Sequence, residues 1–248
     1  MIVIKTKEEI EKMRKSGKIL RLVLDMVKEK IEPGIKTIEL DKFAEDKIYE
    51  LGGIPAFKGY RGFPNALCIS INDEVIHGIP SDRLIQDGDL VKIDGGVILD
   101  GYYSDAAFTK IAGTPKNDTD VKLVEVVEKA FFEAVAVINV GAHLYDIGYS
   151  IQKFVESNGF SVLRDYTGHG IGRNLHEDPS VPNYGKPGTG ITLRAGMTLA
   201  IEPMITAGSY KVYTDKNGWT VKTVDGSNSA HFEHTIAILE DRVELLTV

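Results

Sequence analysis

Residues 90–105, LVKIDGGVILDGYYSD, contain the clearest fold signal in the chain. The apolar and β-branched residues at the start of this stretch predict a strand that continues to Leu99. The pair Asp100-Gly101 predicts a two-residue type I′ turn, in which both turn residues need a positive φ. A hairpin with this turn places Leu99 opposite Tyr102 and fixes the register of both strands.

This register brings two aspartates to one place. It puts Asp94 opposite Ala107, so that Asp105, two residues from Ala107, lies on the same face of the sheet. Diagonal neighbours of this kind are roughly 7–8 Å apart at the backbone, within reach of two carboxylates that share one point. Gly95-Gly96 predicts either a bulge or a close backbone approach. Because apolar residues surround both carboxylates, a cation between them is favoured over two solvated edge aspartates.

The composition is that of a globular protein with a sizeable core. Hydrophobic residues make up 43% of the 248 residues, and the net charge of −7 argues against nucleic acid or an anionic membrane as the main partner. The single cysteine, Cys68, excludes an internal disulfide. No apolar run approaches the roughly 18 residues of a membrane span, and the N-terminus has no signal-peptide pattern. We therefore expect a soluble, cytoplasmic protein.

Four amphipathic helices are expected around the hairpin. A capping box at Thr6 begins the first helix, which ends at Pro33-Gly34, and a second helix begins at Thr37. Asn117-Asp118 caps a third helix, and a fourth covers about 144–157. Short strands and glycine-rich loops fill the rest of the chain, which predicts an α+β protein.

The second half of the chain repeats signals of the first half in the same order. The HGI sequence of residues 77–79 recurs at 169–171. The stretch IQDGDLVKID at 85–94 matches LRAGMTLAIE at 193–202. IEPG at residues 31–34 matches INVG at 138–141, and the helices expected directly after these two stretches share their apolar spacing. Several matches in one order are typical of an internal repeat.

The repeat predicts one domain, residues 1–248, made of two halves of about 1–112 and 113–248. A pseudo-two-fold axis would relate the halves, with helices over one face of a central antiparallel sheet. The acidic strands would meet at the centre of this sheet, where Asp94 corresponds to Glu202.

Two more residues, Glu233 and His169, complete the expected cluster of ionisable side chains. Glu233 lies in SAHFEHTIAIL, whose alternation predicts a half-buried strand, and His169 lies between glycines in TGHGIG. Four carboxylates in one place need about four positive charges, which two divalent cations supply. Oxygen ligands with one imidazole suit Mn, Fe, Co or Zn. Two such ions roughly 3.5–4 Å apart can share a bridging hydroxide and polarise a carbonyl, as in a hydrolase.

These motifs resemble those of the methionine aminopeptidases of the short bacterial kind, type I. The resemblance lies in IDGGVILDGYYSD, GHGIG with HED, IEPM and SAHFEHT, and SINDEVIHGIP and GWTVKT extend it over nearly the whole chain. It implies the pita-bread fold. It also implies removal of the initiator methionine from nascent proteins whose second residue is small, with a metal-bridged hydroxide that attacks the scissile carbonyl.

The resemblance further implies roles for single residues. Two divalent ions, Co, Mn, Fe or Zn, would be held by the metal ligands Asp94, Asp105, His169, Glu202 and Glu233. Substrate contact and catalysis around the scissile bond would fall to His77 and His176, with Glu202 as a catalytic ligand. The methionine pocket would be lined by Tyr60, Phe63, Cys68 and Trp219.

Other implications concern partners and single positions. Asn72 and Ser229 fall where some family members hold a monovalent cation, and His231 stands where the resemblance implies a glutamine. The partner would be the N-terminal Met of peptides and nascent chains, with ribosome association left open. We expect a monomer that binds neither a membrane nor nucleic acid.

Alternatives stay open at each level. His77 and His176 could be satisfied loop histidines, a structural role that we favour for His143 and His234. An Xaa-Pro peptidase uses the same ligand set but carries an additional N-terminal domain, whereas this sequence starts directly with the catalytic repeat. A non-catalytic binding protein on this fold would lose ligands, and all five positions here hold Asp, Glu or His. Hydrolysis of Met-Ala-Ser against an X-Pro dipeptide, with added Mn or Co, distinguishes them.

Overall fold

The predicted hairpin lies in the middle of the main sheet in the computed structural model, which describes residues 2–248. Strands β4 (Leu90–Leu99) and β5 (Tyr102–Ile111) pair along their whole length, with Leu99 opposite Tyr102 and Asp94 opposite Ala107. The turn residues Asp100 and Gly101 have φ values of 51° and 77°. The predicted turn and register are therefore confirmed.

The glycine pair in β4 serves a close approach rather than a bulge. The β4–β5 register runs through Gly95 and Gly96 without interruption, so the bulge alternative is wrong. A Cβ on Gly95 would lie 2.6 Å from Cδ2 of Leu67, and one on Gly96 would lie 2.8 Å from Cβ of Ala56. The approach is strictest at Gly96, where the Cβ would also lie 3.0 Å from the Ser104 carbonyl oxygen, whereas the neighbour of Gly95 is the end of a flexible side chain.

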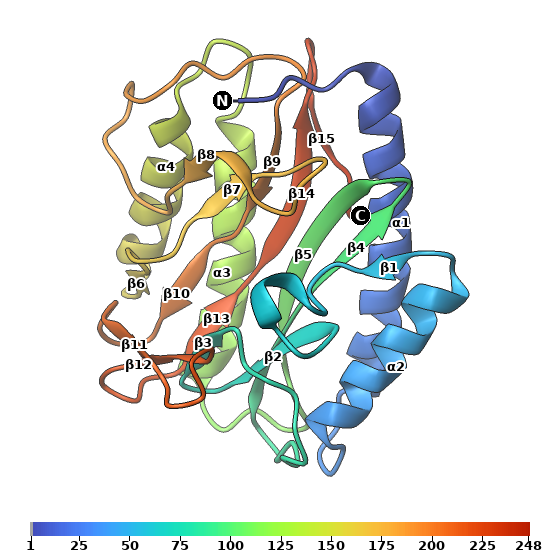
Figure 1. Ribbon diagram of the computed structural model, residues 1–248. Coiled ribbons are helices and arrows are strands. Elements are labelled where there is room, and N and C mark those ends of the chain that lie inside the picture. The colour runs from blue at the N-terminus through green and yellow to red at the C-terminus, as the bar shows by residue number, and fades with distance from the viewer. Residues whose placement is uncertain (1) are drawn as a thin grey trace.

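Within residues 2–248 the main sheet has nine strands, and every hydrogen-bonded pair of neighbours in it is antiparallel. Figure 1 shows how these strands are arranged. The path of the sheet is β1-β4-β5-β14-β9-β7-β8, with β2 joined to β4 and β15 joined to β14. The strands other than the hairpin are β1 (Ile54–Pro55), β2 (Leu67–Ile71), β7 (Gly168–Gly170), β8 (Glu177–Val181), β9 (Thr198–Ile201), β14 (Glu233–Ile238) and β15 (Val243–Leu245).

Two small sheets of three strands each flank the main sheet. One has the order β13-β10-β6 and the other β11-β12-β3. Their strands are β3 (Glu74–Ile76), β6 (Ser161–Val162), β10 (Met204–Thr206), β11 (Val212–Thr214), β12 (Val221–Thr223) and β13 (Ser229–His231). A short 3₁₀ turn, η1 (Tyr60–Gly62), precedes β2.

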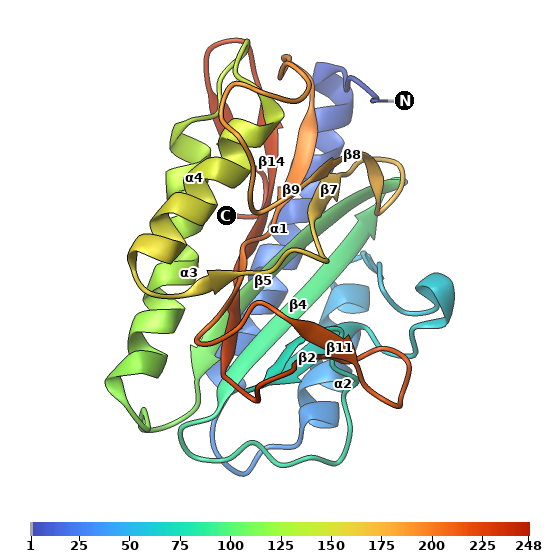
Figure 2. The ribbon, with the colours of Figure 1, turned by 90° about the vertical axis from the view of Figure 1, so that its left-hand side faces the viewer.

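Four helices pack on the main sheet, as the apolar spacing predicts: α1 (Lys7–Lys30), α2 (Thr37–Glu50), α3 (Asp118–Ala136) and α4 (Leu144–Ser157). The capping box is present, with Thr6 and Glu9 each accepting from the other's backbone N–H. Helix α1 packs on β4 and β5, where Leu20 shares a core cluster with Ile93. Helices α3 and α4 pack on each other along the side of β5, β9 and β14 (Figure 2).

The two halves that the repeat predicts, residues 1–112 and 113–248, contribute β5 and β14, which pair with each other. Outward from this junction, β4 follows β5 on one side and β9 follows β14 on the other, which is the predicted pseudo-two-fold arrangement. Matched turns have matched backbones, since Gly34 and Gly141 have φ values of 96° and 97°. The acidic ends of the repeated stretches therefore reach the centre of the sheet from opposite sides.

One prediction about burial is wrong. The strand that begins at Glu233 is buried on both faces, not on one. The reason is that His234 faces Phe131 of α3, with ring centroids 5.3 Å apart, while Glu233 on the other face lines a cavity. Among residues 2–248, no helix combines the length and apolarity that crossing a membrane requires.

Candidate metal centre

The strand register places the predicted ligands on one face of the sheet in two neighbouring rows. In the first row Asp94 lies opposite Ala107, and Ala107 lies opposite Glu233. Cys68 extends this row, because it lies opposite Asp94 on its other side. Glu202 directly follows β9, next to this row. Residues of one row share a face, so these side chains converge.

The second row lies two residues along the strands and therefore on the same face. Asp105 is anchored there by Thr235, whose hydroxyl accepts from the Asp105 N–H at 2.9 Å. Thr235 lies opposite Ala200, and Ala200 lies opposite His169. The alternation of strand residues thus brings Asp105 and His169 beside the first row.

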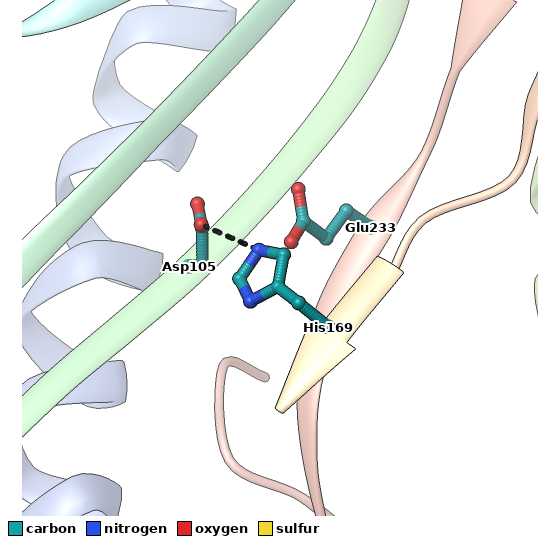
Figure 3. Close-up of side chains that lie close together, drawn as sticks. All are labelled: Asp105, His169 and Glu233. Carbon is teal, nitrogen blue, oxygen red and sulfur yellow. Dashed lines mark ion pairs between the residues drawn. The ribbon is translucent and has the colours of Figure 1, made fainter. Parts of the chain in front are cut away.

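The side chains of the two rows meet. His169 Nε2 lies 3.8 Å from Oδ2 of Asp105 and 3.6 Å from Oε1 of Glu202. Figure 3 shows Asp105, His169 and Glu233 converging from three different strands. Ligand atoms of these three residues lie within 4.8 Å of one another, close enough to hold a metal ion.

The glycines around His169 are needed for this approach. A Cβ on Gly168 would lie 2.4 Å from the Ala200 carbonyl oxygen, and one on Gly170 would lie 2.1 Å from that of Asp178. His169 Nδ1 lies 2.9 Å from the Gly170 carbonyl oxygen, to which it donates in the tautomer that suits this contact. Nε2 is then left with a lone pair toward the carboxylates, the usual state of a metal-binding histidine.

The cluster has the charge and the unsatisfied atoms of a cation site. Burial raises the pKa of Asp94 to about 7. The pKa of Asp105 is raised well above its ordinary value, first by burial and then by the charges of Asp94 and Glu202. Among residues 2–248, the buried side-chain atoms without a hydrogen-bond partner all belong to this cluster: Asp94 Oδ1, Asp105 Oδ1, Glu233 Oε1 and both ring nitrogens of His231. Divalent cations would satisfy these oxygens and offset their repulsion, so the residues fit metal binding.

The predicted substrate residues border the same cavity. Its volume is about 150 Å³, and every predicted residue is among those that line it: Tyr60, Phe63, Cys68, His77, Asp94, Asp105, His169, His176, Glu202, Trp219 and Glu233. The rings of Phe63 and Trp219 meet edge to face, 5.2 Å between centroids. Burial raises the pKa of the Cys68 thiol well above its usual range, so the thiol stays protonated as an apolar wall.

The two loop histidines lie at the cavity but in different surroundings. His176 Nδ1 lies 2.8 Å from the Tyr60 hydroxyl, and the two rings stack. His77 has a φ of 58°, and its ring lies edge-on to Tyr166, 5.9 Å between centroids. Burial lowers the pKa of His77 to about 4, and burial followed by the charge of Arg61 lowers the pKa of His176. Both imidazoles are therefore neutral at pH 7.

Phe57, Arg61 and Leu175 also line the cavity, and the sequence analysis missed them. Two of them had a local signal, since Arg61 directly follows Tyr60 and Leu175 directly precedes His176. Phe57 had no such local signal, because an apolar residue before a glycine-containing loop is equally typical of a position in the hydrophobic core. Of the histidines expected to be structural, His234 Nδ1 lies 2.8 Å from the Thr247 hydroxyl, and His143 caps the N-terminus of α4.

A lysine ammonium fills the place where the resemblance implies a monovalent cation. Lys92 Nζ donates to the carbonyl oxygens of Asn72 and Ser229 at 2.7 and 3.0 Å, and to the Ser229 hydroxyl at 3.3 Å. The side chain is fully buried, and burial lowers its pKa to about 7. Its three oxygen partners match the three N–H donors of the charged form. In its charged form the side chain therefore supplies a cation from within the chain at this position.

Comparison with known proteins agrees with this geometry. The model of metallopeptidase family M24 matches residues 11–240. The chain belongs to metallopeptidase family M24. An M24 chain is a peptidase and hence a hydrolase, and membership implies the divalent metals for which the cluster is built.

Full-length relatives within M24 are methionine aminopeptidases. The chain is 52% identical to the methionine aminopeptidase of Clostridium perfringens and 48% identical to methionine aminopeptidase 1 of Bacillus subtilis, covering 100% of this chain and 99% of each relative. The crystal structure of methionine aminopeptidase from Thermotoga maritima superposes with a TM-score of 0.98, at 48% identity and coverage of 100% and 99%.

Prolidase structures share the fold at lower identity. Prolidase from Pyrococcus furiosus superposes with a TM-score of 0.81 at 26% identity, over 99% of this chain but 65% of that chain. The pseudo-two-fold α+β architecture that the repeat predicts, and the pita-bread fold that the resemblance implies, are thereby confirmed.

Proposed function

We propose that this M24 chain is a metal-dependent aminopeptidase that removes the initiator methionine from nascent proteins whose second residue is small. One observation carries the proposal. The cavity that holds the carboxylate and imidazole cluster continues into an apolar wall of Phe63, Cys68 and Trp219, the shape and chemistry of a methionine side chain next to a cation site.

The five predicted ligands are proposed to hold two divalent ions: Asp94, Asp105, His169, Glu202 and Glu233. When bound, such ions polarise a carbonyl group and lower the pKa of water toward neutrality. Binding and orientation of the substrate are the work of the protein's own residues. The apolar wall holds the methionine side chain, so that the scissile carbonyl lies against the cluster.

His176 is proposed to stabilise the charge that develops on the carbonyl oxygen. When the Tyr60 hydroxyl donates to His176 Nδ1, the neutral ring carries its own proton on Nε2. This Nε2–H can then donate a hydrogen bond to the substrate. His77, a neutral and half-buried imidazole that lines the same cavity, is proposed to orient the peptide next to the scissile bond. Glu202 is proposed to act as a ligand that also accepts a proton during hydrolysis.

We also propose a cellular compartment, an oligomeric state, a domain organisation and a choice of metals. The chain would act in the cytoplasm as a monomer, as one domain of two repeated halves, residues 1–112 and 113–248. Its bound metals would be Co, Mn, Fe or Zn, in keeping with oxygen ligands and imidazole. Association with the ribosome would bring it to nascent chains.

Peptide hydrolysis tests the proposal. Met-Ala-Ser, Met-Ile-Ser and an Ala-Pro dipeptide are offered to the Co-loaded and Mn-loaded protein, with the chelated protein as control. We expect cleavage of Met-Ala-Ser, little cleavage of Met-Ile-Ser because a large second residue does not fit, and none of Ala-Pro. Equal rates on Met-Ala-Ser and Met-Ile-Ser would contradict the proposed selectivity, and cleavage of Ala-Pro alone would favour an Xaa-Pro peptidase.

A further inference from the structure

His231 has none of the roles proposed above, yet its ring lies against the same carboxylates. The side chain is 1% exposed, and Nε2 lies 3.7 Å from Glu202 Oε2 and 3.7 Å from Glu233 Oε2. Both distances are too long for hydrogen bonds, and neither ring nitrogen has any other partner. Leaving a buried polar group unpaired costs about 1–3 kcal/mol, so this ring lacks a ligand.

The surroundings of His231 match those of His169. Glu202 lies between the two imidazoles, with Oε1 3.6 Å from His169 Nε2 and Oε2 3.7 Å from His231 Nε2. Metal–nitrogen and metal–oxygen bonds of about 2.0–2.2 Å allow one ion to contact two atoms at such a separation. Ligand atoms of Glu202, His231 and Glu233 lie within 4.8 Å of one another, as do those of Asp105, His169 and Glu233.

The backbone of His231 is fixed in this position. Its N–H donates to the Thr109 hydroxyl at 2.9 Å, and that hydroxyl donates to its carbonyl oxygen at 2.8 Å. The neighbouring buried histidine, His234, differs because its Nδ1 is already paired with the Thr247 hydroxyl. His231 is thus a positioned imidazole that has acceptor capacity and no partner within the protein.

We propose that His231 Nε2 is a metal ligand that shares an ion with Glu202 and Glu233, so that each metal position carries one imidazole. This inference rests on the proposed two-metal function. A second imidazole favours Fe²⁺, Co²⁺ or Zn²⁺ over the harder Mn²⁺ and Mg²⁺. The structure thereby assigns a preference for metals of the borderline class to this chain.

Proton NMR of the Co²⁺-loaded protein tests the assignment directly. A ligating imidazole gives a ring N–H resonance that is shifted far from the diamagnetic range and disappears in D₂O. We expect two such resonances in the wild-type protein loaded with two equivalents of Co²⁺, and one in His231→Gln. His234→Gln is the matched control, since it removes a buried imidazole without a place in the cluster, and should keep both.

Each other outcome overturns the inference. A single exchangeable resonance in the wild-type protein would show that His231 is not a ligand, without recourse to any variant. Two resonances that persist in His231→Gln would assign the second one to another ring, such as His176. Failure of the proposed function would be seen separately, as absent cleavage of Met-Ala-Ser by protein whose spectrum shows two resonances.

Metal affinity provides a second measurement. His231→Gln should weaken Zn²⁺ binding by about 10-fold or more and Mn²⁺ binding by less, which changes the ratio of the two dissociation constants. A role limited to packing would weaken both alike, and that result would contradict the inference. His231→Asn, a smaller amide, replaces His231→Gln if circular dichroism shows that the latter does not fold.

Discussion

His169 and His176 are neighbours with different partners. Their ring centroids are 4.2 Å apart, but His169 faces the carboxylates of Asp105 and Glu202 whereas His176 faces the Tyr60 hydroxyl. An imidazole among carboxylates is placed to bind a cation, and one held by a hydroxyl at the cavity edge is placed to donate to a substrate. The two rings should therefore respond differently to removal.

We expect His176→Ala to keep its metals and lose about 10²–10³ in kcat, the typical cost of one donor to a developing oxyanion. Its KM should change less, because the lost contact strengthens in the transition state. His169→Ala should lose metal and activity together. His143→Ala, which changes a partly exposed residue at the N-terminus of α4, should lose neither. Metal stoichiometry by plasma mass spectrometry and steady-state kinetics check this. Roles are wrongly assigned if His176→Ala is the variant that loses metal.

Lys92 gives a second prediction at the scale of one residue. Lys92→Ala removes the buried ammonium from the oxygens of Asn72 and Ser229 and should cost about 2–5 kcal/mol, the range for truncating a large buried side chain. K⁺ should then bind these oxygens and recover part of the stability. Replacing choline chloride by KCl should raise the Tm of Lys92→Ala but not of the wild-type protein. An equal response of both would contradict the idea.

Strand β7 carries His169, and close backbone contacts with the neighbouring segments fix the position of this strand. It is three residues long and lies between β8 and β9, and its two glycines leave no room for side chains. The position of His169 therefore depends on how closely its neighbours approach.

Gly170→Ala should displace β7, because the new Cβ would lie 2.1 Å from a backbone oxygen of Asp178. We expect a loss of about 1–3 kcal/mol in unfolding free energy and weaker metal binding as His169 shifts. Gly218→Ala is the control, since a Cβ there meets open space and the strain is limited to its φ of 77°. Urea denaturation and metal titration measure both effects. Unchanged metal affinity in Gly170→Ala would show that β7 tolerates the shift.

For the molecule as a whole, the proposed metal site joins the two proposed halves. Asp94 and Asp105 come from the first half, whereas His169, Glu202 and Glu233 come from the second. Burial raises the pKa of both Glu202 and Glu233 well above the ordinary value, and the charges of neighbouring carboxylates raise it further. Cations that bind only the folded chain should therefore stabilise the junction.

Chelation with EDTA should lower the Tm, and Co²⁺ should restore it. An ion present at about 1,000 times its dissociation constant stabilises the folded state by about 4 kcal/mol. The same addition should have much less effect on Asp94→Asn and on Glu202→Gln, which hold equivalent positions, while the exposed Asp82→Asn should respond like the wild-type protein. Scanning calorimetry measures these shifts. Equal Co²⁺ responses in all variants would contradict the shared site.

Much of the arrangement was predictable because its causes are local. The type I′ turn at Asp100-Gly101 sets the register of β4 and β5, so the common face of Asp94 and Asp105 follows from one dipeptide. The internal repeat then pointed to Glu202. Apolar spacing and caps predicted the four helices for the same reason, since each signal lies within a few residues of its effect.

Other features were decided by contacts between distant segments, which a sequence without its fold does not contain. The burial of both faces of β14 needs α3 on one side and the cavity on the other, and the placing of Lys92 Nζ on Asn72 and Ser229 joins three segments. The orientation of His231 toward Glu202 and Glu233 is of this kind. The amino-acid sequence predicts the charged residues and the strands that carry Asp94, Asp105 and Glu233, because these signals are local, but it does not predict that His169 lies on a strand. The distances between these side chains depend on the tertiary structure, because packing of distant segments decides whether a side chain is close enough to bind a metal.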